Sequence, residues 1–80
     1  MNKKERIRNN VETALDFARG KHGNMRSAHE GYAVLLEEVD ELWQAIKHGT
    51  SAEARIEATQ VAAMAIRFLE DLYDGQGNSR

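Results

Sequence analysis

Hydrophobic positions recur at helical spacing in three stretches of the 80-residue chain, and glycines interrupt the pattern between them. Apolar residues three and four positions apart lie on one side of a helix, because each residue turns the chain by about 100°. The chain has no proline and is rich in Ala, Leu, Glu, Arg and Lys, which favours helix over most of its length. The sequence therefore predicts an all-α protein with three helices, at roughly 3–19, 28–48 and 51–73.

The two interruptions carry residues that end one helix and begin the next. The segment "ARGKHGNMRS" contains two glycines and ends in Ser27, and "KHGTSAE" contains Gly49 followed by Thr50. A glutamate follows each hydroxyl residue three positions later. Ser27 with Glu30 and Thr50 with Glu53 are therefore predicted to form capping boxes, in which the two side chains bond to each other's backbone N–H groups.

The second predicted helix has the strongest apolar pattern, with seven large residues within an arc of about 120°. We expect this seam to face the core. For its aromatic residues Tyr32 and Trp43, packing in the core or in a subunit interface is favoured over stacking on a nucleobase. The seam comprises Tyr32, Leu35, Leu36, Val39, Leu42, Trp43 and Ile46.

Length and composition narrow the classes of function. Residues 1–80 are long enough for one domain, with a frayed tail at about 75–80, and a chain of this size buries only a little over ~60% of its unfolded surface. The absence of cysteine excludes disulfides and the usual zinc knuckles. We therefore expect the chain to gain stability by association with further copies, as a dimer or a tetramer.

Charge and hydropathy argue against two kinds of partner. The 11 basic and 13 acidic residues give a net charge of -2 and are mixed along the chain, which provides no basic surface for nucleic acid. The longest apolar runs are far shorter than the ~20 residues of a membrane span, and the first residues lack the apolar core of a signal peptide. We expect a soluble, cytoplasmic protein that binds neither nucleic acid nor membrane.

Acidic residues occupy unusual positions on the second and third predicted helices. Glu57 falls inside the apolar arc of its helix, with Gln60 one turn later, and Glu38 lies at the margin of the seam, with Glu41 about 60° further round. Residues three apart share a helix face, and two helices joined by a short turn pack antiparallel, so the two pairs are expected to converge.

Converging carboxylates in a partly apolar place cost several kcal/mol unless they are protonated, paired with Lys or Arg, or neutralised by a cation. Oxygen ligands without cysteine or histidine suit Mg²⁺ or Mn²⁺, and protein-bound magnesium commonly pairs with substrate phosphates. The pattern indicates chemistry on a phosphate ester or anhydride. The alternative for each acid is a partly exposed residue in an ordinary ion pair.

The motif "LLEEVDEL", followed about twenty residues later by "EATQ", resembles the signature of the MazG-like all-α nucleoside triphosphate pyrophosphohydrolases. The likeness covers roughly residues 30–72. It implies a helical bundle of second and third helices in a dimer or tetramer, which binds Mg²⁺ and hydrolyses a nucleoside triphosphate to a monophosphate and pyrophosphate. Deoxy and noncanonical nucleotides are among the candidate substrates. Under this resemblance Glu38, Glu41 and Glu57 are metal ligands and catalytic residues, and Glu37 is an outer acid.

The chain departs from the family pattern at one position, where Gln60 stands in place of the usual last aspartate. An amide oxygen can coordinate Mg²⁺, but it brings no negative charge, so metal affinity should be lower. The alternative function is a noncatalytic helical module that binds a nucleotide or a protein through a degenerate metal site. A third alternative is a structural oligomer whose acids pair with basic residues across a subunit interface.

Three residues are weaker candidates for substrate binding. Arg67 lies near Gln60 on its helix face and Lys47 ends the second helix, so either could hold a triphosphate or be an ordinary helix charge. Trp43 could stack on a base. The basic loop "RGKHGNMR" could touch phosphates, but it lacks the residues of a phosphate loop, and a plain connector is favoured.

Overall fold

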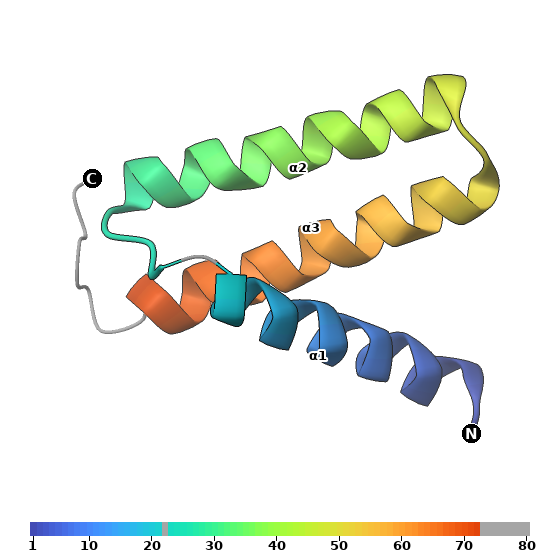
Figure 1. The fold of residues 1–80 in the computed structure, drawn as a ribbon, viewed down its shortest axis with the longest axis horizontal. Helices are drawn as coiled ribbons and strands as arrows, with labels where there is room; N and C mark the ends of the chain where they lie inside the picture. The colour runs from blue at the N-terminus through green and yellow to red at the C-terminus, as the bar shows by residue number, and fades with distance from the viewer. Residues whose placement is uncertain (22, 73–80) are drawn as a thin grey trace.

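The computed structural model describes residues 1–21 and 23–72, which form three helices and contain no strand. In chain order these are α1 (Lys3–Lys21), α2 (Ala28–His48) and α3 (Ser51–Leu72), as Figure 1 shows. The predicted helices are confirmed, and α1 runs slightly further than expected. The predicted last residue of the third helix and the predicted frayed tail lie outside the described residues.

Local hydrogen bonds at the helix starts explain why the boundaries could be predicted. Thr50 N donates to Glu53 Oε1 over 2.8 Å, and Glu53 N donates to Thr50 Oγ1 over 3.1 Å. At the start of α2, Glu30 N donates to Ser27 Oγ over 3.1 Å. The capping box of Thr50 with Glu53 is confirmed. At Ser27 the hydroxyl cap is confirmed, but Glu30 Oε1 accepts from the backbone N–H of Arg26, over 2.6 Å, one residue before the predicted donor.

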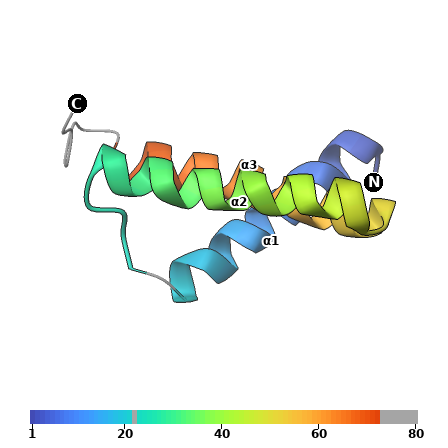
Figure 2. The same cartoon turned by 90° about the horizontal axis from the view of Figure 1, so that it is seen from above.

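Helix α3 lies in the middle of the fold, with α2 packed on one side and α1 on the other (Figure 1). Among the described residues, α1 and α2 do not pack against each other, and in Figure 2 α1 runs obliquely to α2, with its C-terminal end well away from that helix. The buried centre joins all three helices and the loop before α2. It consists of Ala18, Met25 and Met64, with Val34, Leu35 and Phe68 packed against them.

Close packing of α2 on α3 depends on a glycine. A Cβ atom placed on Gly31 would lie 2.4 Å from Cδ2 and 2.7 Å from Cε2 of Phe68. Such distances are far inside van der Waals contact, so any side chain at this position would displace the ring. Gly31 is accordingly buried, and it lets the end of α3 approach the start of α2.

An ion pair on α3 holds the loop that precedes α2. Arg67 is 4% exposed, and its guanidinium donates to the carbonyl oxygen of Gly23. Arg67 Nε also lies 3.7 Å from Asp71 Oδ2, and the same carboxylate oxygen accepts a hydrogen bond of 2.8 Å from the backbone N–H of Met25. Arg67 and Asp71, one helical turn apart on α3, thus hold Gly23 and Met25 in place before the start of α2.

The seam of α2 does not face the core of the protomer as expected. Leu35 packs on the buried centre and Leu42 is half-buried, but the other five side chains are exposed. The buried face of α2 does not coincide with the seam. Helix α3 contacts the side of α2 that carries Gly31, Val34 and Glu38. The exposed members of the seam are Tyr32, Leu36, Val39, Trp43 and Ile46.

Within the part of the chain that the structure describes, none of the helices combines the length and the apolar character needed to cross a bilayer.

Candidate metal and substrate site

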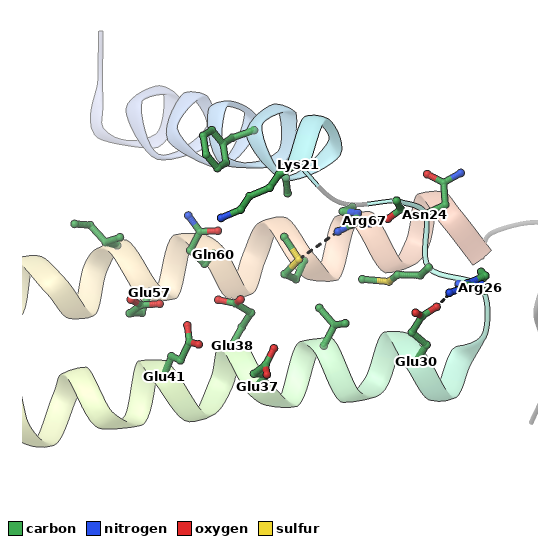
Figure 3. Close-up of a pocket in the computed structure, with 17 residues that line it drawn as sticks. Lys21, Asn24, Arg26, Glu30, Glu37, Glu38, Glu41, Glu57, Gln60 and Arg67 are labelled. Carbon is green, nitrogen blue, oxygen red and sulfur yellow. Dashed lines mark hydrogen bonds between the residues drawn. The ribbon is translucent and has the colours of Figure 1, made fainter.

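Three carboxylates from two helices come together between α2 and α3. Glu38 and Glu41 belong to α2 and Glu57 to α3, and one oxygen of each lies within 4.8 Å of one oxygen of each of the others. In Figure 3 the three side chains gather in the space between the two helices. The convergence predicted for the two pairs is confirmed for Glu38, Glu41 and Glu57, because the short connection after His48 makes α2 and α3 antiparallel. Gln60, the fourth residue of the predicted pairs, points away from this cluster, toward α1 (Figure 3).

The charges of this cluster are mutually unfavourable. The pKa of Glu38 is raised above its usual value, first because partial burial disfavours its charged form and then because Glu41, Glu57 and Glu37 are close negative charges. Among the described residues, none of the three clustered carboxylates forms a salt bridge with Lys or Arg. A divalent cation would supply the positive charge that the chain itself does not place there.

The donor set fits a hard divalent cation. All three groups offer carboxylate oxygens, which are the ligands that Mg²⁺ and Mn²⁺ prefer, and their mutual separation allows one ion to contact all three. Glu41 is exposed, while Glu38 and Glu57 are half-buried, so the cluster opens on one side to solvent. An ion held here could therefore keep water ligands and meet a substrate.

The cluster forms part of the wall of a cavity of about 910 Å³ between the three helices. Cavities of this size accommodate small-molecule ligands. The wall is acidic at the cluster, and basic side chains line it at the end of α1, in the following loop and on α3, with Glu30 beside Arg26 (Figure 3). The basic lining residues are Lys21, Arg26 and Arg67, and the apolar ones include Phe17, Val34, Ile56 and Met64.

Gln60 and Glu37 also line this cavity. In Figure 3 the Gln60 amide lies on the side of α3 that faces α1, near Lys21, whereas the three carboxylates lie between α3 and α2. Glu37 is exposed, and its charge acts on Glu38. The arrangement places Gln60 where it could contact a ligand together with Lys21.

The weaker candidates lie in different surroundings. Arg67 borders the cavity, but its guanidinium is engaged with Gly23 and Asp71, which gives it a structural part. Lys47 and Trp43 are absent from the cavity wall. Instead, Lys47 Nζ lies 5.3 Å from the centre of the Trp43 ring, a cation–π contact on the exposed surface of α2.

Sequence reasoning did not single out Lys21. It is the last residue of α1, and its Nζ lies 5.8 Å from the centre of the Phe17 ring. In Figure 3 its side chain extends from α1 toward Gln60. The loop "RGKHGNMR" was interpreted as a plain connector, yet Gly23, Asn24 and Arg26 line the cavity. In the sequence, the basic composition of this loop was the one indication that it lines a binding site. Its position at the cavity depends on the path of α1, which the sequence does not reveal.

Comparison with models of protein families, with curated proteins and with solved structures gave no match for this chain. The function therefore has to be argued from the site.

Proposed function

We propose that this protein is a Mg²⁺-dependent nucleoside triphosphate pyrophosphohydrolase, which releases pyrophosphate and a nucleoside monophosphate. The observation that carries the proposal is the convergence of Glu38, Glu41 and Glu57 in the wall of a ligand-sized cavity. The spacing of the acids, which resembles that of MazG-like enzymes, supports the reaction type. The chemistry of the cavity supports a substrate that combines phosphates with an apolar or aromatic group.

The residues of the chain have distinct parts in this proposal. Glu38, Glu41 and Glu57 hold the cation, and their crowded charges favour its binding. When bound, Mg²⁺ would neutralise the triphosphate and lower the pKa of a coordinated water. The basic end of the cavity attracts the phosphates that extend beyond the cation. The apolar lining residues offer a surface on which the base or sugar of the nucleotide can pack.

The proposal also includes assembly of the chain as a homo-oligomer. Only five apolar residues in the described part of the chain are buried, namely Leu15, Ala18, Met25, Ala63 and Met64. A core of this size gives little stability to a chain of 80 residues. Association of copies would bury further apolar surface and so increase the stability of each folded chain.

The test is release of pyrophosphate from a panel of canonical, deoxy and modified nucleoside triphosphates with Mg²⁺ or Mn²⁺. Glu57→Gln keeps the size of the side chain and removes its charge, and we expect the rate to fall by roughly 100-fold or more. Glu12→Gln is the matched control, because Glu12 is an exposed acid on α1 outside the cavity. Circular dichroism of both variants shows whether the helices are intact. Equal rates for Glu57→Gln and the native protein would contradict the proposal.

A second candidate function is a noncatalytic module that binds a nucleotide or a protein through a degenerate metal site. Gln60 favours it, because this neutral residue stands where the resembled motif has an aspartate and lies toward Lys21 in Figure 3. Calorimetry with a nucleoside triphosphate, with and without Mg²⁺, separates the two candidates. Metal-dependent binding without pyrophosphate release favours the module, and appearance of activity in Gln60→Asp would then show that the amide is the reason.

A further inference from the structure

A second cavity lies beside the candidate site, between α1 and the first half of α3. The two helices pack on each other, and in Figure 1 they diverge toward their N-terminal ends. The cavity measures about 900 Å³, and its lining residues come from positions 7–17 of α1 and 52–62 of α3. We call it the α1–α3 groove.

The α1–α3 groove adjoins the cavity that contains the carboxylate cluster. Phe17, Ile56 and Gln60 line both cavities. Ile56 directly precedes Glu57 of the cluster, and Gln60 lies one turn further along α3, on the side that faces α1 (Figure 3). A ligand bound at the cluster can therefore extend past these residues into the groove.

The charges of the first cavity determine which part of a nucleotide extends into the groove. The basic lining residues Lys21, Arg26 and Arg67 come from the end of α1, the following loop and the last third of α3. Phe17 lies one turn before Lys21, and Ile56 lies about 16 Å before Arg67 along the helix axis. Phosphates attracted toward the basic residues thus leave the base of the nucleotide on the side of the groove.

The wall of the groove suits a base. Aliphatic side chains and alanines make up most of it, and none of the described residues that line it is an acid that could bind a cation. Phe17, at the junction of the two cavities, is 69% exposed. An exposed aromatic ring is a platform on which any base can stack. Lys21 Nζ lies 5.8 Å from the centre of this ring, so a positive charge for the phosphates adjoins the platform for the base.

We propose that the α1–α3 groove binds the base of the nucleotide, with Phe17 as the stacking residue, and that it selects bases with an exocyclic amino group. This inference deepens the proposed function and rests on it for the position of the phosphates. It adds a specificity that the carboxylate cluster does not supply, because a bound cation recognises phosphates and not the base.

Two threonines in the groove account for the selection. Thr13 Oγ1 donates to Asn9 O over 3.0 Å, and Thr59 Oγ1 donates to Arg55 O over 2.8 Å. A hydroxyl group has one hydrogen and two lone pairs, and in both threonines the hydrogen is engaged by the backbone. Both residues line the groove, so their oxygens act there as acceptors.

Acceptor oxygens distinguish among the bases. The exocyclic amino groups of cytosine, adenine and guanine donate hydrogen bonds, whereas the exocyclic polar groups of uracil and thymine are carbonyl oxygens. A carbonyl placed against the threonine oxygens loses its hydrogen bonds to water and gains none. Arg55 also lines the groove, but its N–H groups donate to ring nitrogens or carbonyl oxygens, which every base has, so Arg55 does not discriminate.

The first test measures binding without hydrolysis. Nucleoside monophosphates with Mg²⁺ are suitable ligands, because they contain a base and a phosphate but cannot release pyrophosphate. Cytidine monophosphate should shift the NMR signals of the Thr13 and Thr59 methyl groups and of the Phe17 ring, and inorganic pyrophosphate should not. Uridine monophosphate should bind roughly 10-fold more weakly, because it leaves the threonine acceptors unsatisfied. Absence of these shifts, or equal affinity for the two monophosphates, would overturn the inference.

This result can be separated from the outcome for hydrolysis. Pyrophosphate release from triphosphates, without shifts in the groove, would overturn the inference and leave the proposed function standing. Shifts in the groove without pyrophosphate release would support the inference and contradict the hydrolysis.

Variants of Phe17 test the stacking. Phe17→Leu keeps an apolar side chain but removes the ring, and it should weaken the binding of cytidine monophosphate by roughly 10-fold. Phe17→Tyr restores a ring and should recover the affinity. Circular dichroism should show intact helices in both, because Phe17 is 69% exposed. Leu69→Ala is the control, because Leu69 is 60% exposed on α3 and lines neither cavity. An unchanged affinity in Phe17→Leu would overturn the stacking assignment.

Variants of the threonines test the selection. Thr13→Val combined with Thr59→Val keeps the shape of both side chains and removes both acceptors, so cytidine and uridine monophosphates should bind equally. Thr13→Ser combined with Thr59→Ser keeps the hydroxyl groups and is the matched control, in which the preference should persist. A preference for cytidine monophosphate that survives in the valine variant would overturn the role of the threonines.

Discussion

At the scale of single residues, Glu38 carries its charge in surroundings that disfavour it. Its pKa is raised by partial burial and by the neighbouring carboxylates, so the folded protein holds a proton at this position more tightly than the unfolded chain does. The stability that depends on Glu38 is complete below the unfolded pKa of about 4.3 and is lost as the pH rises through the higher folded pKa.

Glu38→Gln should therefore stabilise the metal-free protein at pH 7 by roughly a few tenths of a kcal/mol, the scale of exposed like-charge pairs on a helix. It should also remove part of the loss of stability that sets in as the pH rises above about 4.3 and through the folded pKa of Glu38. Chemical denaturation across this range measures both effects. Glu12→Gln controls for a general change in net charge, and an identical pH profile for Glu38→Gln and the native chain would contradict the expectation.

Gly31 is a second residue whose identity is set by its contacts. Gly31→Ala forces a Cβ atom into the Phe68 ring, and we expect a loss of about 1–3 kcal/mol in the free energy of unfolding. Gly20→Ala is a matched control, because a Cβ at Gly20 meets no atom within 4 Å. In a helix this control should be neutral or stabilising by up to about 1 kcal/mol. Equal effects of the two substitutions would show that packing on Phe68 is not the cause.

At the scale of elements, two ion pairs near the end of α3 allow a direct comparison of burial. Asp71 accepts from Met25 and lies next to the buried Arg67, so Asp71→Ala leaves a buried charge without its partner. We expect a loss of about 3 kcal/mol. Glu70→Ala breaks the pair with Arg19, in which both side chains are over 40% exposed, and should cost under about 1 kcal/mol.

Urea denaturation of the two variants tests this difference. Hydrogen exchange adds a second measurement, since Asp71→Ala should raise the exchange rate of the Met25 amide, which loses its acceptor. A cost for Glu70→Ala as large as that for Asp71→Ala would contradict the argument from burial.

The sequence predicted the helices well because their ends are determined locally. Ser27, Thr50 and the glutamates three residues after them cap helices without help from distant residues. An equivalent pair at the start of α1, Asn2 with Glu5, was not among the predicted caps, and it forms both reciprocal hydrogen bonds, of 2.8 and 3.1 Å. Its signal, an asparagine three residues before a glutamate, was present in the sequence.

The faces of the helices were less predictable than their ends. The apolar arc of α2 is wider than the surface that α3 can cover, and Gly31, which has no side chain to mark it as buried, determines where α3 approaches. The acidic cluster was predictable because spacing and a short turn fix it. The position of Lys21 was not, because it depends on the angle between α1 and α3, which no local pattern encodes.

At the scale of the whole molecule, the cavity unites charges that the chain disperses in sequence. Its acidic residues come from α2 and α3, and its basic residues come from α1, the following loop and α3. If the acidic wall binds Mg²⁺, the folded state gains stability that the unfolded chain lacks. The gain is about 1.4 kcal/mol at a metal concentration ten times the dissociation constant.

Thermal unfolding should therefore move upward by several degrees when Mg²⁺ is added and return when a chelator removes it. Glu57→Gln should lose most of this shift, and Glu12→Gln should keep it. A melting temperature that is insensitive to Mg²⁺ would favour a purely structural assembly of the chain.

The central place of α3 also has a consequence for how the chain folds. Helices α2 and α3 are joined by a tight turn and contact each other along their length, so their contacts are local in sequence and form at low entropic cost. Helix α1 touches only α3 among the described helices, and a long stretch of chain must close before it does. Substitutions of residues at the contact between α2 and α3 should slow folding, whereas Leu15→Ala in α1 should mainly speed unfolding. Stopped-flow kinetics can measure both rates.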